Sequence, residues 1–318
     1  MTPISNPYLT WLSSVLGAPR TPRFGGGAAQ AVLGYATGYG PAEIEIFVRS
    51  LRAHFDGRVV LFVDRGRADL DELLKTHDIT PEALPWGDAW APHPVTARFA
   101  AYETWLSERP WISEVLLTDV RDVVFQGNPF AEPVTGLEAF TEAEGEVLAA
   151  HAFNMKHLRS LAGEGMAQAV ADKPCLCAGT ILGPARAVTQ LCRVLLMTAA
   201  IPRSGVASGF GTDQAAYNLA VHLGIVEAEV RPNFGRVATI GLSNADGLTI
   251  SDDGLIVNPD GGVSPVVHQY DRHAHLTAAV SAKWGRDDYS VTKARRKTFS
   301  DRRQRLVASI GRRLPEFR

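Results

Sequence analysis

Apolar residues in the first 120 positions alternate between short continuous runs and stretches with helical spacing. The runs AVLGYATGY (31–39), RVVLFVD (58–64) and SEVLLTD (113–119) are typical of parallel strands covered on both faces, the first including the exit of its strand. Between them, two sets of apolar residues recur at helical spacing: Ile44, Phe47, Val48, Leu51 and Phe55, then Phe99, Tyr102, Trp105 and Leu106. This alternation predicts an α/β fold with a mostly parallel, doubly wound central sheet flanked by helices.

The middle of the chain has more helical patterns and shorter strand patterns. Helices are predicted over FNMKHLRSLAGEG (153–165), over 184–200, and over TDQAAYNLAVHLG (212–224), where Thr212 is the expected N-cap. Strands are predicted over LEAFTEA (137–143), GIVEAEV (224–230) and VATIG (237–241). LTIS and LIVN, separated by a DDG turn, predict a hairpin.

We divide the 318 residues into three parts. Residues 1–30 form an N-terminal extension that includes the loop-like stretch TPRFGGGAAQ, residues 31–280 form one α/β domain, and residues 281–318 form a basic tail. The hydrophobic share of 46% and the charged share of 21% are typical of a soluble globular protein with a sizeable core.

The charge is unevenly distributed. Residues 283–318 hold 12 Lys or Arg and 4 Asp or Glu, a balance of +8, so the rest of the chain carries −10 of the total of −2. Three interpretations of the tail stay open: a solvated amphipathic helix packed on the body, peripheral contact with an anionic membrane, and nucleic-acid binding. The last is the least favoured, because the tail interleaves few aromatic residues and the body is acidic.

The remaining composition indicates a cytoplasmic protein. The three cysteines provide no disulfide framework or zinc-ligand spacing, which favours a reducing compartment. No apolar run reaches membrane-spanning length, and the first residues lack the charged region of a signal peptide.

The segment VLLTDVRDVVFQGNPF (115–130) is the strongest candidate for chemistry. Asp119 ends one apolar run and Asp122 precedes the next, so both carboxylates are expected at the mouth of the sheet, where ligands of such folds bind. Two adjacent carboxylates repel unless a cation lies between them, and oxygen ligands suit Mg²⁺ or Mn²⁺. Both can reach one ion only if the chain turns at Val120–Arg121, because residues i and i+3 of a strand face opposite sides. The alternative is a surface Asp–Arg pair at a strand end.

This segment resembles the metal-binding segment of GT-A glycosyltransferases, in which a strand ends in Asp-x-Asp and is followed by an apolar strand and a Pro-containing stretch. Three further segments are similar to that family in kind and order: CAGTILGP (177–184), GTDQAAYN (211–218) and VVHQYDRH (266–273). The resemblance covers roughly residues 30–275. It implies a GT-A-like domain that transfers a sugar from a nucleoside diphosphate donor, most naturally a UDP-sugar, to a sugar, lipid or other acceptor in polysaccharide or glycoconjugate synthesis.

The resemblance also assigns roles to residues. Mn²⁺ or Mg²⁺ would be held by Asp119, Asp122 and His268, and the reaction would involve Asp213 and Gln214. From their places on the chain, Ala36, Thr37 and Gly38 at the exit of the first strand are expected to approach the base or ribose, Asp64 is a candidate contact to the base, and Arg98 is the candidate cation for the diphosphate. Asp119, Arg121, Gly179 and Thr180 complete the expected nucleotide-sugar site.

Alternative roles remain open for several of these residues, and alternative functions remain open for the protein. Arg121 stands where an Asp-x-Asp motif would have its second acid, so either Asp122 is the ligand and Asp119 contacts the nucleoside, or the metal site is altered. Asp213 could instead be an acid favoured at a helix N-terminus, and His268 a hydrogen-bonded residue at a strand end. A non-catalytic nucleotide-sugar-binding module is the alternative function. A metal-dependent phosphohydrolase would require more clustered His and Asp ligands.

Overall fold

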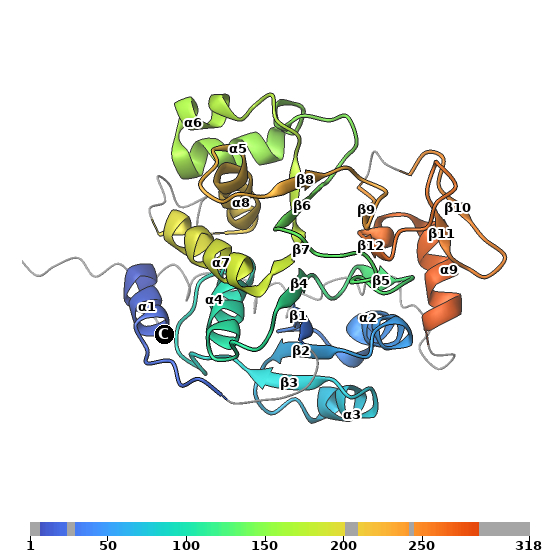
Figure 1. Ribbon diagram of the computed structural model, residues 1–318, viewed down its shortest axis with the longest axis horizontal. Coiled ribbons are helices and arrows are strands. Elements are labelled where there is room, and N and C mark those ends of the chain that lie inside the picture. The colour runs from blue at the N-terminus through green and yellow to red at the C-terminus, as the bar shows by residue number, and fades with distance from the viewer. Residues whose placement is uncertain (1–6, 24–28, 201–208, 242–244, 286–318) are drawn as a thin grey trace, which may run out of the picture.

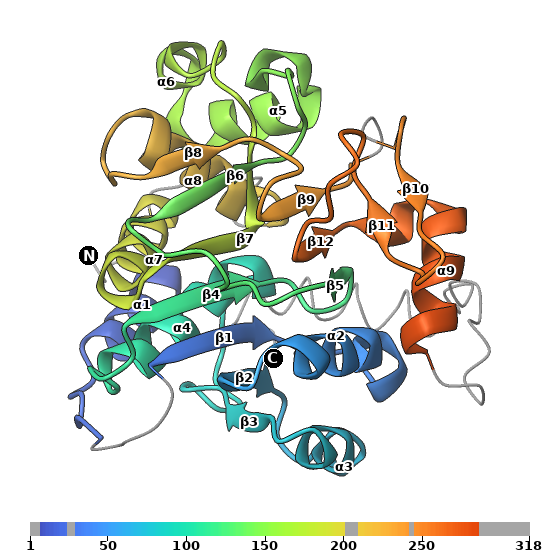
Figure 2. The same ribbon diagram turned by 45° about the vertical axis from the view of Figure 1, so that its right-hand side comes forward.

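The computed structural model describes residues 7–23, 29–200, 209–241 and 245–285. Its centre is a seven-stranded sheet of order β3-β2-β1-β4-β7-β6-β8 (Figures 1 and 2). The strands are β1 (Gln30–Tyr35), β2 (Arg58–Val63), β3 (Thr80–Ala83), β4 (Glu114–Thr118), β6 (Glu138–Thr141), β7 (Leu176–Pro184) and β8 (Glu229–Arg231). Only β7 runs antiparallel to its neighbours β4 and β6, so the sheet is mostly parallel, as predicted.

Helices cover both faces of this sheet (Figure 2). The α-helices are α1 (Pro7–Leu16), α2 (Pro41–His54), α3 (Ala68–Thr76), α4 (Pro94–Ser107), α5 (Ala152–Ala162), α6 (Glu164–Ala169), α7 (Ala185–Ala199), α8 (Thr212–His222) and α9 (Ala274–Trp284). Short 3₁₀ turns span Leu148–Ala150 and Tyr270–Arg272. In the described part of the chain, no helix has the length and apolar character needed to cross a lipid bilayer.

The alternation of side chains along the strands separates two cores. Ala31 and Leu33 of β1 pack with residues of α1, α4, α7 and α8, whereas Val32 packs on the opposite face with residues of α2 and α3. Successive side chains of a strand point to opposite faces, so a strand covered by helices on both sides must be apolar throughout. This explains the continuous apolar runs from which the strands were predicted.

A small sheet stands beside the central one. It has the order β5-β12-β9, from β5 (Val123–Phe125), β12 (Val266–His268) and β9 (Val237–Thr239). It carries His268 in β12, and Asp122 directly precedes its strand β5. A third apolar cluster joins β12 and β9 to α9 and to the β10–β11 hairpin, Thr249–Ile250 and Ile256–Val257. The predicted hairpin is present and antiparallel.

Some predicted boundaries differ. Helix α8 has Gly211 as its N-cap, with a φ of +92°, and Thr212 is its first helical residue, so the predicted Thr212 cap is wrong. Ser281, where we placed the start of the tail, lies within α9. The tail helix predicted beyond residue 285 lies outside the described residues.

Candidate metal centre and active site

The turn between β4 and β5 brings Asp119 and Asp122 together. Strand β4 ends at Thr118 and β5 begins at Val123, so the chain turns where a shared ion requires it. Backbone hydrogen bonds hold both ends of the turn: Asp119 N donates to Gly179 O at 2.8 Å, and Gln269 N donates to Asp122 O at 2.7 Å. Both carboxylates are therefore presented by a fixed backbone at the carboxyl end of a central strand.

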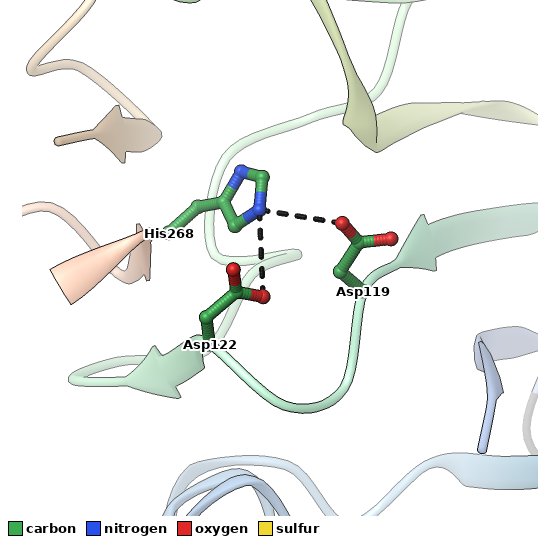
Figure 3. Close-up of side chains that lie close together, drawn as sticks. All are labelled: Asp119, Asp122 and His268. Carbon is green, nitrogen blue, oxygen red and sulfur yellow. Dashed lines mark ion pairs between the residues drawn. The ribbon is translucent and has the colours of Figure 1, made fainter. Parts of the chain in front are cut away.

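The pairing of β12 with β5 places His268 beside this turn. The two strands are antiparallel, and His268 lies opposite Val123, the residue after Asp122. His268 Nε2 lies 3.5 Å from Asp119 Oδ2 and 3.7 Å from Asp122 Oδ1 (Figure 3). The three ligand atoms lie within 4.8 Å of one another, so this cluster could hold a metal ion.

The spacing of these atoms fits a single divalent ion. Two ligands at about 2.1 Å from an octahedral ion are about 3 to 4.2 Å apart, which brackets the two distances from His268 Nε2. Those distances are too long for good hydrogen bonds, and the buried His268 Nε2 has no hydrogen-bond partner. An unpartnered imidazole nitrogen facing two carboxylates is a suitable donor set for a divalent cation.

Gly179 is required by the close approach of strand β7 to the cluster. A Cβ atom at this position would lie 2.9 Å from Asp119 Oδ2 and from His268 Nε2, and would also collide with His268 Cε1. A side chain here would push two of the three candidate ligands apart. The glycine belongs to the CAGTILGP segment that we singled out from the sequence.

Arg98 connects the metal cluster to Asp213. Its Nη1 donates to Asp119 Oδ1, and its Nη2 donates to Asp213 Oδ2 at 2.8 Å and to Ala178 O at 2.9 Å. Only 8% of Arg98 is exposed, so the guanidinium is a buried bridge between two carboxylates. We expected Arg98 to face a diphosphate; it lines the cavity, but two of its nitrogens are already engaged by protein groups.

The charges of this network are compatible with a bound cation. Asp119, Asp122 and Asp213 carry three negative charges and Arg98 one positive charge, which leaves −2 if His268 is neutral. Arg121 adds no net charge, because its guanidinium is paired with Asp271 at 2.7 Å.

The pKa values of His268, Asp119 and Asp122 are shifted by burial and by the charges around them. Burial would lower the pKa of His268, but Cys177, whose Sγ lies 3.4 Å from Nδ1, and the two carboxylates raise it well above its ordinary value. Burial would raise the pKa of Asp119, yet Arg98 and His268 hold it at about 2. The pKa of Asp122 is raised, chiefly by burial. Without a metal, a proton on His268 supplies part of the missing positive charge.

Metal binding should therefore compete with protonation of His268. We expect the affinity for Mn²⁺ to rise with pH by up to about tenfold per unit, levelling off once the pH exceeds the raised pKa of His268. Calorimetric titration of Mn²⁺ in two buffers of different ionisation enthalpy should detect about one proton released per ion below that pKa. Affinity independent of pH, without proton release, would contradict this assignment.

The stability of the metal-free protein should fall as the pH rises, whereas the affinity for Mn²⁺ rises. The folded-state pKa of His268 is above the unfolded value of 6.5, so the stabilisation from protonated His268 is complete below 6.5 and is lost as the pH rises through the folded-state value.

The cluster opens into a cavity of about 820 Å³ beyond the carboxyl ends of β1 and β4. Nine of the residues predicted for the site line it: Thr37, Arg98, Asp119, Arg121, Asp122, Gly179, Asp213, Gln214 and His268. The other predicted residues, Ala36, Gly38, Asp64 and Thr180, do not. Asp64 Oδ2 accepts a hydrogen bond from Gly38 N at 2.7 Å, so this carboxylate holds the loop after β1. Ala36 and Thr180 are fully buried.

Several lining residues were not predicted. Glu142 directly follows β6, as Asp119 follows β4, and accepts a hydrogen bond from Gln214 Nε2 at 2.7 Å. Because β6 runs parallel to β4, the strand-end rule applied to LEAFTEA would have identified Glu142. Tyr35, Tyr39, Phe153 and Phe210 also line the cavity, and no local motif marked them.

Comparison of the chain with profiles of known protein families and with curated proteins finds no match in either set.

Proposed function

We propose that this protein is a metal-dependent glycosyltransferase of the GT-A type. It would transfer a sugar from a nucleoside diphosphate donor to an acceptor hydroxyl, and a UDP-sugar is the donor to test first. The observation that carries the proposal is the juxtaposition of two groups in one cavity: the Asp119–Asp122–His268 cluster and the Arg98–Asp213 pair. Three of the four sequence segments with the character of that family contribute Asp119, Asp122, Asp213 and His268, and the fourth contributes Gly179 beside the cluster. Arg98 comes from α4, outside these segments.

The cluster would hold the cation that a diphosphate leaving group needs. Asp119, Asp122 and His268 would bind Mn²⁺ or Mg²⁺, which when bound neutralises the charge that develops on the diphosphate as the sugar–phosphate bond breaks. Arg98 keeps Asp119 ionised and oriented toward the cluster. The backbone bonds that hold the turn mean that little reorganisation is needed when the donor arrives.

Asp213 is the candidate catalytic carboxylate. It is 8% exposed, it lines the cavity, and its pKa is raised, chiefly by burial. A raised pKa suits a group that accepts a proton from an acceptor hydroxyl in an inverting transfer. In a retaining transfer the same carboxylate would stabilise positive charge at the anomeric carbon. The anomeric configuration of the product, read by NMR, separates these two roles.

The loop after β1 would receive the nucleoside. Tyr35, Thr37 and Tyr39 line the cavity here, and the bond from Gly38 N to Asp64 holds the loop. Tyrosine rings offer a face on which a base can stack.

Calorimetric titration with UDP and Mn²⁺ tests the proposal. A folded sample should bind UDP in the presence of Mn²⁺ and much more weakly in the presence of EDTA. Absence of UDP binding under both conditions would overturn the proposal. Release of free UDP from a UDP-sugar over time then separates a transferase, which leaks some sugar to water, from a non-catalytic binding module, which does not.

A further inference from the structure

Two exposed phenylalanines line the cavity and are not members of the metal cluster. Phe153 is 50% exposed and Phe210 is 66% exposed. They are the aromatic members of the group of exposed large apolar side chains among the described residues, and both border the cavity. Exposed aromatic surface at a concave site is typical of ligand contact, because it is costly to leave in water.

These rings are held in place by their neighbours. The centroids of Phe153 and Phe210 are 6.0 Å apart, and Phe153 also packs against His157 at 4.5 Å. Phe210 lies edge-on to His93, the N-cap of α4, at 6.3 Å. A Cβ atom on Gly211 would lie 2.9 Å from the Phe153 ring, so the glycine allows this packing. The pair, which we call the aromatic platform, is therefore pre-organised.

The aromatic platform is connected to the candidate catalytic groups rather than to the metal ligands. Phe210 precedes Asp213 by three residues. Phe153 precedes Asn154, whose Oδ1 accepts a hydrogen bond from Gln214 Nε2 at 3.2 Å. Neither α5 nor the turn before α8 contributes to the metal cluster. The two rings are thus neighbours in sequence of residues at the proposed catalytic groups, Asn154 beside Gln214 and Asp213 three residues after Phe210.

Polar groups line the same cavity as the platform. Glu146 and His151 both line the cavity and are paired, with His151 Nε2 2.8 Å from Glu146 Oε2. Glu142 and Gln214 also line the cavity and are hydrogen-bonded to each other. Aromatic faces bordered by carboxylate, imidazole and amide groups match a pyranose, which has an apolar C–H face and a rim of hydroxyls.

The size of the cavity allows a second ligand. Its volume of about 820 Å³ is near the upper end of the range of about 300–1,000 Å³ for small-molecule sites.

We infer that Phe153 and Phe210 form an acceptor subsite that binds a pyranose ring of a saccharide acceptor by stacking. This inference rests on the proposed function, because it takes the nucleotide to occupy the other part of the cavity.

Saturation-transfer NMR with a panel of free saccharides tests the inference. The panel is glucose, galactose, mannose, N-acetylglucosamine, lactose, maltose and cellobiose, in the presence of UDP and Mn²⁺. We expect at least one to bind, with the strongest saturation on its ring C–H protons. The double variant Phe153→Ala/Phe210→Ala should lose about tenfold in affinity, and Phe153→Trp should retain binding. Phe153→Leu, which keeps apolar bulk without a ring face, should bind more weakly than the wild type, by no more than the double variant.

Controls separate this inference from the proposed function. Met197→Ala removes an equally exposed apolar side chain outside the cavity and should change nothing. UDP binding by the double variant should equal that of the wild type. If UDP binding falls with the aromatic rings, they bind the nucleoside and the inference is wrong. If UDP binds normally but no saccharide in the panel does, the inference is also wrong. Saccharide binding without any UDP binding would overturn the proposed function and leave the saccharide subsite standing.

Discussion

Replacing Asp122 with asparagine is expected to lower the affinity for Mn²⁺ by more than about 100-fold, the upper end of what loss of a supporting contact to a metal ligand costs. Asp122 Oδ1 is one of the three candidate ligand atoms, and the neutral amide supplies no charge to the ion. Calorimetric titration with Mn²⁺ measures the change. If the proposed function holds, UDP release from a UDP-sugar should fall in parallel, because the same charge would stabilise the departing diphosphate.

The metal-free Asp122→Asn protein should keep its stability. Arg121 loses one partner at 3.2 Å but keeps Asp271 at 2.7 Å, and Asp119 loses a like-charged neighbour. Saturating Mn²⁺ should raise the melting temperature of the wild type but not of the variant. Asp260→Asn is the matched control, since Asp260 is exposed and bonds Gly262 N in a loop that does not line the cavity. Equal Mn²⁺ affinity in wild type and Asp122→Asn would remove Asp122 from the site.

The positions of Asp119 and Asp122 between two strands could be predicted from the sequence. The runs around VLLTDVRDVVF predict two strands separated by a turn, and the structure has β4 and β5 with Asp119 and Asp122 between them. Periodicity and turn chemistry act over a few residues, so a short segment contains the information.

The place of His268 in the cluster could not be derived from the hydrophobic pattern alone. His268 reaches the cluster because β12 pairs antiparallel with β5 in a register that places it opposite Val123. A one-residue slip would turn the imidazole to the other face of the small sheet. Only the resemblance of VVHQYDRH to a family segment suggested His268, and the register depends on packing across 145 residues.

Short elements with little apolar periodicity were missed for a related reason. Strand β3 has the sequence TPEA and contains a proline, yet it pairs with β2 at the edge of the sheet. Proline is tolerated there because an edge strand needs fewer backbone donors. Arg98 illustrates the same limit at the site: its helix was predicted, but its bridge between Asp119 and Asp213 depends on three elements meeting in space.

Replacing Arg98 with methionine is expected to lower the free energy of unfolding of the metal-free protein by about 3–5 kcal/mol, the usual cost of breaking a buried ion pair. Most of the loss should come from Asp213, whose side chain is 9% exposed and would keep a charge without its partner. Asp119 should contribute less, because its side chain is 36% exposed and water screens it. Urea-induced unfolding at neutral pH measures the difference.

The loss of stability in Arg98→Met should depend on pH, and a second substitution should relieve it. The pKa of Asp119 is lowered to about 2 from an ordinary 3.8, so its stabilisation is present above 3.8 and is lost as the pH falls through about 2. Without Arg98 the pKa of Asp213 should rise further, and protonation at low pH would remove the unpaired charge. The gap between wild type and Arg98→Met should therefore narrow on acidification. Arg98→Met/Asp213→Asn should recover most of the stability, and it keeps the test decisive if the single variant does not fold. A single variant as stable as the wild type at neutral pH would mean that the Arg98 bridge between the metal cluster and Asp213 has no structural role.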